Sequence, residues 1–287
     1  MTATRTQQCE VCTGEEQIAY LTKGEYPFLQ CIGCGHISVQ LDISDAELVE
    51  VYDSHFFSDG AYVDYIKDRQ VLQKNFSRFI ITLRQYCPAG LLLEVGCAYG
   101  FFLELARQHR HVQGVDINEE ATTCARKQLG LDVTCGDLLD LPIGGETHDI
   151  VTMWDTIEHL RCPAAYVSKI STILKPGGIL ALTTGDVGSL VASVRGRRWR
   201  LYYPPFHLHY FSRRTLAQLL GRFGLEIVEY RAVGFYRSLD VMLYRIFFDK
   251  KPLASRNIYL AATKMGLTTR TMYLNLFDIM LVIAKKI

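Results

Sequence analysis

Residues 91–118 read LLLEVGCAYGFFLELARQHRHVQGVDIN, and this stretch decides the fold. An apolar run ends at Glu94, a turn of small residues follows, and a helix-like segment leads to a second apolar run that ends at Asp116. This is the pattern of a strand, a turn, a helix and a second strand that ends in an acidic residue, where a pair of ribose hydroxyls is usually held. The stretch therefore predicts a nucleotide-binding α/β unit.

The spacing of the small residues indicates which kind of nucleotide fits the turn. A dinucleotide site has small residues at offsets 0, 2 and 5, so that a pyrophosphate can approach the helix N-terminus. Here Gly96, Ala98 and Gly100 stand at offsets 0, 2 and 4, and bulky Phe101 stands at offset 5. The carboxylate of Glu94 would repel a pyrophosphate but can accept hydrogen bonds from an ammonium group. The turn therefore suits the amino-acid end of S-adenosylmethionine (SAM).

Three later motifs follow in a consistent order. LDVTCGD, residues 131–137, alternates apolar and polar residues and ends at Asp137, in place to meet an adenine amino group. HDIVTMWDTIEHL, residues 148–160, begins as a buried strand that ends at Trp154 and Asp155. LKPGGILALTTGD, residues 174–186, contains a helix end, a Pro-Gly-Gly turn and another strand. This alternation predicts a parallel, doubly wound sheet with its ligand at the carboxyl ends of the strands.

With these four motifs in sequence, residues 88–230 resemble the class I SAM-dependent methyltransferases. The resemblance is greatest to the group that includes the ubiquinone-biosynthesis O-methyltransferases and tailoring enzymes of glycans and natural products. It implies a Rossmann-like, seven-stranded α/β sheet whose last strand, within residues 278–287, is antiparallel. The cofactor-binding residues that it implies are Glu94, Gly96, Ala98, Tyr99, Gly100, Asp116, Ile117, Asp137, Leu138, Trp154 and Asp155. Trp154 would shield the sulfonium or stack near adenine, or else be an ordinary core residue.

Two CxxC pairs near the N-terminus predict a metal site. Cys9, Cys12, Cys31 and Cys34 can place four thiolates around a tetrahedral Zn²⁺ ion. A closed shell of four sulfurs leaves no open position, so the expected role of the zinc is structural. A redox dithiol is the alternative, disfavoured because no thioredoxin-like strand and helix surround either pair. His36 is expected to be a surface residue.

The charge is strongly uneven along the chain, although the net charge is only +1. Residues 1–60 carry 2 basic and 10 acidic side chains, whereas residues 187–287 carry 17 basic and 5 acidic ones. The acidic N-terminal segment argues against nucleic acid, because it would repel phosphates. The acidic and basic segments can attract one another within one subunit or between two, so that a homodimer is possible. Alternatively, the basic C-terminal third can bind an anionic acceptor.

Composition sets the outer limits. At 287 residues and 49% hydrophobic content, the chain can bury a large core, and one main domain with a second, small one is the expected organisation. No apolar run approaches the ~20 residues that a transmembrane helix needs, and no signal peptide is expected. Nine cysteines then indicate reduced thiols in the cytoplasm.

The predicted organisation has five parts: a zinc ribbon at 1–43, N-terminal helices over the cofactor site at 44–88, a SAM-binding core at 89–235, a helical insert at 236–276 and a final strand at 277–287. Within the second part, Ser44 is expected to cap a short helix, and a long helix should run from about Tyr62 to Tyr86. The apolar residues that should lie roughly on one face of the long helix are Val63, Ile66, Val71, Phe76, Phe79, Ile80 and Leu83. The insert is expected to cap the acceptor pocket. A dimer contact, or a membrane contact through its apolar face and flanking Lys250 and Lys251, is the alternative.

Three histidines are candidates for the base that removes a proton from the acceptor. His207 lies in PFHLHYFS, which resembles a segment that the family has after the fifth strand. His209 could share a face with His207, and His159 follows the fourth strand. Each could instead have a structural role. The arginines at 195, 197, 198 and 200 form a solvated loop or bind a phosphate or carboxylate of the acceptor.

The sequence therefore predicts a cytoplasmic SAM-dependent methyltransferase with a structural zinc. Its acceptor would be a small, carrier-linked or nucleotide-linked molecule, methylated at a hydroxyl in a glycan or natural-product tailoring pathway. The alternatives are an N- or C-methyltransferase on a similar acceptor, a zinc-ribbon RNA methyltransferase, and a SAM-binding subunit without catalysis.

Overall fold

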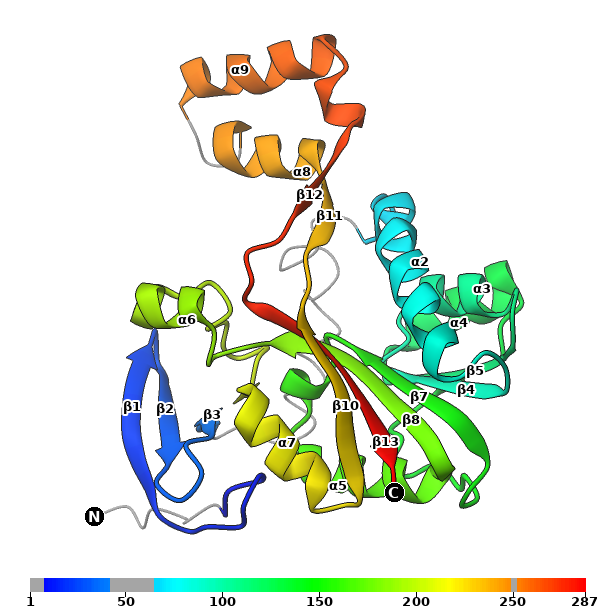
Figure 1. Ribbon diagram of the computed structural model, residues 1–287. Helices are drawn as coiled ribbons and strands as arrows, with labels where there is room; N and C mark the ends of the chain where they lie inside the picture. Colours follow the sequence, from blue (N-terminus) through cyan, green and yellow to red (C-terminus); the bar gives the residue numbers. More distant parts are fainter. Residues whose placement is uncertain (1–7, 42–64, 249–251) are drawn as a thin grey trace.

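The computed structural model describes residues 8–41, 65–248 and 252–287 (Figure 1). The helix predicted after Ser44, the start of the long helix at Tyr62, and Lys250 and Lys251 lie outside the described residues. Within the described ranges, no helix is both long enough and apolar enough to span a membrane.

A seven-stranded sheet forms the centre of the molecule, with strand order β10-β13-β8-β7-β4-β5-β6. The neighbours from β8 to β6 run parallel, whereas β13 is antiparallel to both β8 and β10. The strands are β4 (Leu91–Val95), β5 (His111–Asp116), β6 (Val133–Cys135), β7 (His148–Trp154), β8 (Leu174–Gly185), β10 (Leu225–Ala232) and β13 (Ile279–Lys286). The predicted Rossmann-like sheet with an antiparallel last strand is confirmed.

Helices cover both faces of this sheet (Figure 1). One face carries α2 (Arg69–Tyr86), α3 (Phe101–Ala106) and α4 (Glu119–Leu129), and the other carries α5 (Pro163–Ile173) and α7 (Arg213–Gly221). Because side chains alternate along a strand, Leu92 packs on the first face and Leu93 on the second. Burial on both faces explains the nearly continuous apolar runs of β4, β7 and β8.

Helix α2 has the predicted apolar face but a later start. Phe76, Phe79, Ile80 and Leu83 are buried against the sheet and α3. The prediction that Ile66 joins this face is wrong: Ile66 precedes the helix and its side chain is 55% exposed.

A second, smaller sheet combines the N-terminal segment with the main body. Its order is β1 (Gln17–Lys23), β2 (Tyr26–Cys31), β3 (Ile37–Val39) and β9 (His209–Tyr210), with antiparallel neighbours. Strand β9 belongs to the long connection after β8, which also contains α6 (Leu190–Arg195). The core of this sheet contains Phe28, Ile37, Val39, Trp199, Tyr202 and Tyr210. The N-terminal sheet is thus completed by β9, which pairs with β3 although the two strands lie about 170 residues apart in the chain.

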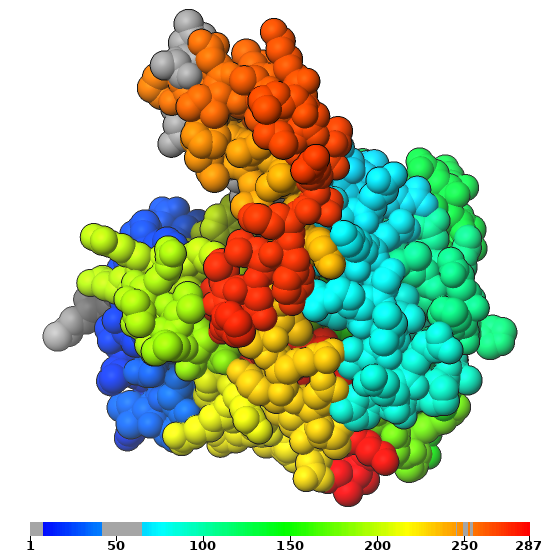
Figure 2. Space-filling view, turned by 45° about the horizontal axis from the view of Figure 1, so that its top comes forward, coloured from blue at the N-terminus to red at the C-terminus, as the bar shows by residue number. Residues whose placement is uncertain are grey.

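Between β10 and β13 the chain leaves the sheet as a two-stranded ribbon of β11 (Phe235–Ser238) and β12 (Thr271–Leu274). This ribbon carries α8 (Leu239–Leu243), a π-helical turn and α9 (Leu253–Lys264). Figures 1 and 2 show the insert standing away from the sheet next to α2. The Asn75 amide in α2 fixes its base, accepting from Tyr236 N at 2.7 Å and donating to Tyr236 O at 3.0 Å. The ribbon was not predicted; that the insert caps an acceptor pocket stays a prediction.

Candidate functional site

The turn after β4 is left-handed at three positions, with φ of +76° at Gly96, +45° at Ala98 and +75° at Gly100. A Cβ atom at Gly96 would lie 2.6 Å from Thr156 Oγ1, and one at Gly100 would lie 2.5 Å from Leu131 Cδ1. Both glycines are therefore required by packing as well as by backbone angle. The turn brings main-chain groups to the carboxyl edge of the sheet.

Asp116, at the end of β5, is joined to this turn. Its Oδ2 accepts from Ala98 N at 2.7 Å, and its Oδ1 accepts from Asn118 N at 2.9 Å. Ile117 follows it with 43% of its surface exposed, and Tyr99 is buried beside the turn with its ring stacked on Tyr65 at 5.7 Å. The predicted ribose-binding carboxylate thus lies at the predicted edge, held in a fixed orientation.

Glu94 is the buried acidic group of this edge. Its side chain is 3% exposed, and its Oε2 has no hydrogen-bond partner among the residues the structure describes. Burial and the neighbouring Asp116 hold the pKa of Glu94 well above its usual range. An unpaired buried carboxyl oxygen is costly. The site therefore fits a ligand that brings a positive hydrogen-bond donor, as the ammonium group of SAM does.

Asp137 lies in the loop after β6, and α5 orients its carboxylate. Tyr166 donates its hydroxyl to Asp137 Oδ2 at 2.5 Å, and Leu139 N donates to Oδ1 at 2.8 Å. Leu138 packs into the core and is 1% exposed. Gly136 N donates to Asp116 O at 2.9 Å, which joins this loop to the end of β5. The predicted adenine-binding segment therefore adjoins the predicted ribose-binding residue. Nothing in the sequence identified Tyr166.

Trp154, the last residue of β7, packs toward α2 and α3. Its ring stacks on Phe79 with centroids 4.7 Å apart and meets Phe102 edge-on at 5.2 Å. The indole is 8% exposed, and its Nε1 has no partner in the described parts of the chain. The ring is thus mostly a core element.

Asp155 follows with φ of +48° and is half-buried. Its Oδ1 accepts from Thr183 Oγ1 at 2.8 Å, and its amide donates to Thr183 O at 3.1 Å. Burial raises the pKa of Asp155, while the nearby charges of Arg237 and Arg200 oppose this. The positive charges that act on Asp155 thus come from the insert, at Arg237, and from the loop after α6, at Arg200.

His159 and His207 meet edge-on, with ring centroids 4.8 Å apart. Each has its Nδ1 bonded to a main-chain carbonyl, His159 to Phe206 O at 2.8 Å and His207 to Leu201 O at 2.9 Å. Burial lowers the pKa of His159 to about 3 and that of His207 to about 4. Both imidazoles are therefore neutral at physiological pH.

Glu158 completes this group and was not identified from the sequence. It is 5% exposed, and its Oε2 has no partner among the described residues. Burial and then Asp155 raise its pKa to about 8. One ligand atom each of Glu158, His159 and His207 lie within 4.8 Å of one another. Two imidazoles and a carboxylate could hold a divalent cation, which would act as a Lewis acid there.

His209 is not brought together with the other two histidines. Its Nδ1 lies 2.9 Å from His36 Nε2, and its Nε2 lies 3.3 Å from Arg161 O. The expectation that His36 is a surface residue is wrong, because β9 covers it and leaves 2% of its surface exposed. His209 therefore contacts the N-terminal sheet.

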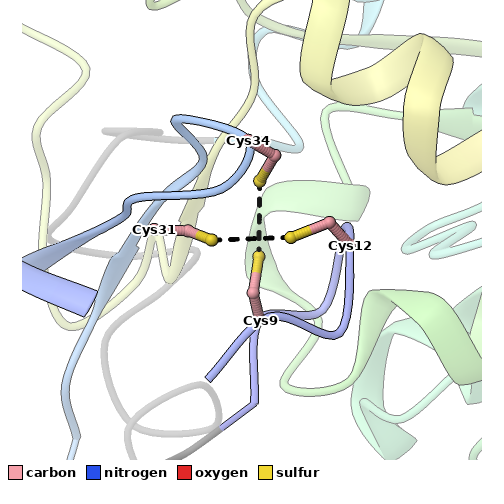
Figure 3. Close-up of side chains that lie close together, drawn as sticks. All are labelled: Cys9, Cys12, Cys31 and Cys34. Carbon is pink, nitrogen blue, oxygen red and sulfur yellow. Dashed lines mark hydrogen bonds between the residues drawn. The ribbon is translucent and has the colours of Figure 1, made fainter. Parts of the chain in front are cut away.

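The four predicted cysteines converge on one point (Figure 3). The Sγ atoms of Cys9 and Cys34 are 3.6 Å apart, those of Cys12 and Cys31 are 3.5 Å apart, and all four lie within 4.8 Å. Tetrahedral zinc with bonds of about 2.3 Å would separate its sulfurs by about 3.8 Å, so the arrangement fits the ion. Burial raises the pKa of Cys9 to about 11, so a cation is needed to hold that thiol ionised.

The arginine cluster divides into two parts. Arg195, Arg197 and Arg198 are exposed around the end of α6. Arg200 instead donates to buried Asp278 at 2.8 Å, and Asp278 also accepts from Trp199 Nε1 at 3.0 Å. Of the four arginines in this cluster, Arg200 is thus the one that an ion pair holds near the strand tips.

Comparison with known proteins agrees with this geometry. A family model described as a methyltransferase domain matches residues 68–230. The chain is 31% identical over 147 residues to a probable S-adenosylmethionine-dependent methyltransferase of Mycolicibacterium smegmatis, covering 50% of this chain and 55% of that protein. It is 29% identical over 156 residues to the ubiquinone biosynthesis O-methyltransferase of Cereibacter sphaeroides, covering 50% of this chain and 63% of that protein. The chain thus spans little more than half the length of these curated relatives.

The fold is also shared with a SAM-dependent methyltransferase of Archaeoglobus fulgidus, whose crystal structure matches with a TM-score of 0.55 and 18% identity. That match covers 82% of this chain and 100% of the other. Because the family model spans more than half of the sequence, and because the sheet, the turn and the acidic strand ends agree with it, this chain belongs to the family of methyltransferase domains.

Proposed function

We propose that this protein is a SAM-dependent methyltransferase that methylates a hydroxyl of a small, carrier-linked or nucleotide-linked acceptor. Glu94 carries the cofactor assignment, since its buried Oε2 lies unpartnered among the described residues beside the left-handed turn. The SAM ammonium group would satisfy this oxygen and stabilise the ionised carboxylate. Asp116 would accept from the ribose, and Asp137 with Leu138 would meet the adenine.

Bound SAM supplies a methyl group on a positively charged sulfur. Transfer is an in-line displacement, and holding the two reactants in line can contribute about 7–11 kcal/mol. The tips of β4 and β7, with Asp155 held by Thr183, would provide the rigid edge for this alignment. The protein's main task is therefore positioning.

We assign to His207 the removal of the proton from the acceptor hydroxyl. Its Nδ1 is bonded to Leu201 O, so in the neutral ring the proton is on Nδ1 and Nε2 carries the lone pair. A hydroxyl acceptor could pass its proton to Nε2 as the methyl group arrives. Such assistance is typically worth 10²–10⁴-fold in rate. A cation on Glu158, His159 and His207 is the alternative way to ionise the hydroxyl, and it would make turnover sensitive to chelators.

An acceptor that carries a phosphate or carboxylate is supported by charge. The positive charges of Arg237 and Arg200 both act to lower the pKa of the Asp155 carboxyl group, and Arg200 is also paired with Asp278. Guanidinium groups bind such anions with paired hydrogen bonds. The net charge of +12 over residues 187–287 would also attract an anionic acceptor.

The first test is calorimetric titration of SAM against the wild-type protein and two variants. Asp116→Ala should weaken binding roughly 10- to 100-fold, because hydrogen bonds to a charged acceptor are worth about 1.5–3 kcal/mol. Asp140→Ala is the control, since Asp140 is exposed. Unchanged affinity in Asp116→Ala would show that this edge does not hold the ribose.

Methyl transfer itself is tested with SAM that carries a deuterated methyl group and a panel of anionic hydroxylated acceptors. Mass spectrometry detects the labelled product, and NMR identifies oxygen, nitrogen or carbon as the methylated atom. Tight, salt-sensitive binding of RNA in a filter assay would favour an RNA substrate instead.

A further inference from the structure

The loop that carries His207 is built into the N-terminal sheet through its next residues. In the β3–β9 pairing, Ile37 faces Tyr210 and Ser38 faces His209. Val39 N donates to Leu208 O at 2.8 Å, so the pairing extends to the residue directly after His207.

Leu208 also bonds to the other side of the site. Its amide donates to Glu158 O at 2.8 Å. A single residue therefore joins β3 to the turn Ile157–His159, and His207 lies next to it in the chain. Displacement of β3 would disturb both hydrogen bonds of Leu208, and with them the relative positions of Glu158 and His207.

Side chains reinforce this backbone connection. His36 Nε2 and His209 Nδ1 are 2.9 Å apart, and His209 Nε2 is 3.3 Å from Arg161 O. The His36 ring also stacks on His209 with centroids 5.2 Å apart and contacts Phe211 at 4.9 Å. Because a neutral imidazole has one N–H, the consistent arrangement is donation from His209 to Arg161 O and from His36 to His209.

The same network begins at the cysteine site. His36 N donates to Cys34 Sγ at 3.4 Å, and Cys31 N donates to His36 O at 2.9 Å. The first cysteine pair is anchored separately, since Glu10 accepts from Ala164 N at 3.1 Å at the start of α5. The four-cysteine site is therefore attached to α5 through Glu10, and to β3 through the hydrogen bonds of His36.

We infer that His36 and His209 are positioning residues, through which the four-cysteine site holds the segment of His207 against the turn of Glu158. His209, a candidate base by sequence, acts here through its neighbours without touching the acceptor. The inference rests on the proposed function only for what His207 does in the reaction; the mechanical connection stands on the hydrogen bonds and ring contacts alone.

The test compares His36→Leu with His36→Gln in the zinc-loaded, full-length protein. Glutamine can place an amide N–H where His36 Nε2 donates, whereas leucine fills similar space without a donor. His109→Ala is the control because His109 is exposed. Zinc content by mass spectrometry, SAM affinity by calorimetry, amide hydrogen exchange of Leu208 and Val39, and kcat are measured for each.

We expect His36→Leu to keep its zinc and its SAM affinity, while Leu208 and Val39 exchange on the order of 10-fold faster, as for loss of a buried hydrogen bond. Its kcat should fall, and His36→Gln should recover both the slow exchange and kcat. Wild-type exchange in a zinc-loaded His36→Leu protein would overturn the inference, as would equal behaviour of the two variants. If the chain transfers no methyl group at all, exchange still decides the connection, so the two proposals fail separately.

Discussion

At the scale of single residues, burial determines which groups could do chemistry. Half-buried His207 and buried Glu158 lie close together, and desolvation shifts their pKa values in opposite directions, lowering that of His207 to about 4 and raising that of Glu158 to about 8. Both shifts have desolvation as their largest cause, because burial disfavours the charged form of each group. The pair is therefore mostly uncharged near neutral pH, and His207 can accept a proton while Glu158 can donate a hydrogen bond.

His207→Ala should lower kcat by about 10²- to 10⁴-fold and leave SAM affinity unchanged. Because the pKa of His207 is about 4 in the folded protein, its base form is fully present above about pH 5. The ratio of wild-type to variant kcat should therefore stay constant from pH 6 to 7 in a pH–rate series. A ratio that changes with pH around 6.5, as an ordinary histidine titrates, would show that His207 is solvated. Equal kcat for the wild type and the variant would show that His207 only anchors the loop.

At the scale of elements, local sequence chemistry predicted what forms but not where each element ends. The turn after β4 needs glycine at positions where a methyl group would collide with distant side chains. Its location was predicted from the sequence, because the φ requirement is local. Helix α2 begins at Arg69, later than its apolar pattern suggested, and exposed Ile66 marks the difference. An apolar pattern indicates a face, whereas helix termini depend on packing and capping.

Gly96→Ala tests the turn directly. The left-handed φ of +76° alone should cost about 1–2 kcal/mol, and the collision with Thr156 should add to it. Gly130→Ala isolates the backbone part, because Gly130 has φ of +60° and no atom within 4 Å of an added Cβ. Chemical denaturation should give a larger loss for Gly96→Ala, together with loss of SAM binding. Equal losses would mean that Thr156 moves aside at little energy.

At the scale of the whole molecule, the small N-terminal sheet is part of the structure that surrounds the site. Its fourth strand is β9, and its cysteines pack in the same core as β7, α5 and α7. Metal binding at these four thiols, three of them buried, would contribute directly to folding. The stability of the acceptor segment should therefore depend on the metal.

Cys31→Ser should release zinc and lower the free energy of unfolding by several kcal/mol, since it removes one of four ligands from a closed shell. Cys135→Ser is the control, because Cys135 is exposed and outside the cluster. Metal analysis and urea denaturation measure the two effects. Full zinc content in Cys31→Ser would contradict the four-thiolate site.

The sequence by itself determined the features that local chemistry demands: the small-residue turn, the acidic ends of β4 and β5, the two cysteine pairs and the apolar strands of the parallel sheet. Only the tertiary structure decided that β9 completes the N-terminal sheet, that His36 is buried against His209, and that Glu158 joins His159 and His207. These contacts join segments far apart in the chain. Their energy comes from packing and hydrogen bonds formed when the whole chain folds, and no local pattern records which distant partner a residue meets.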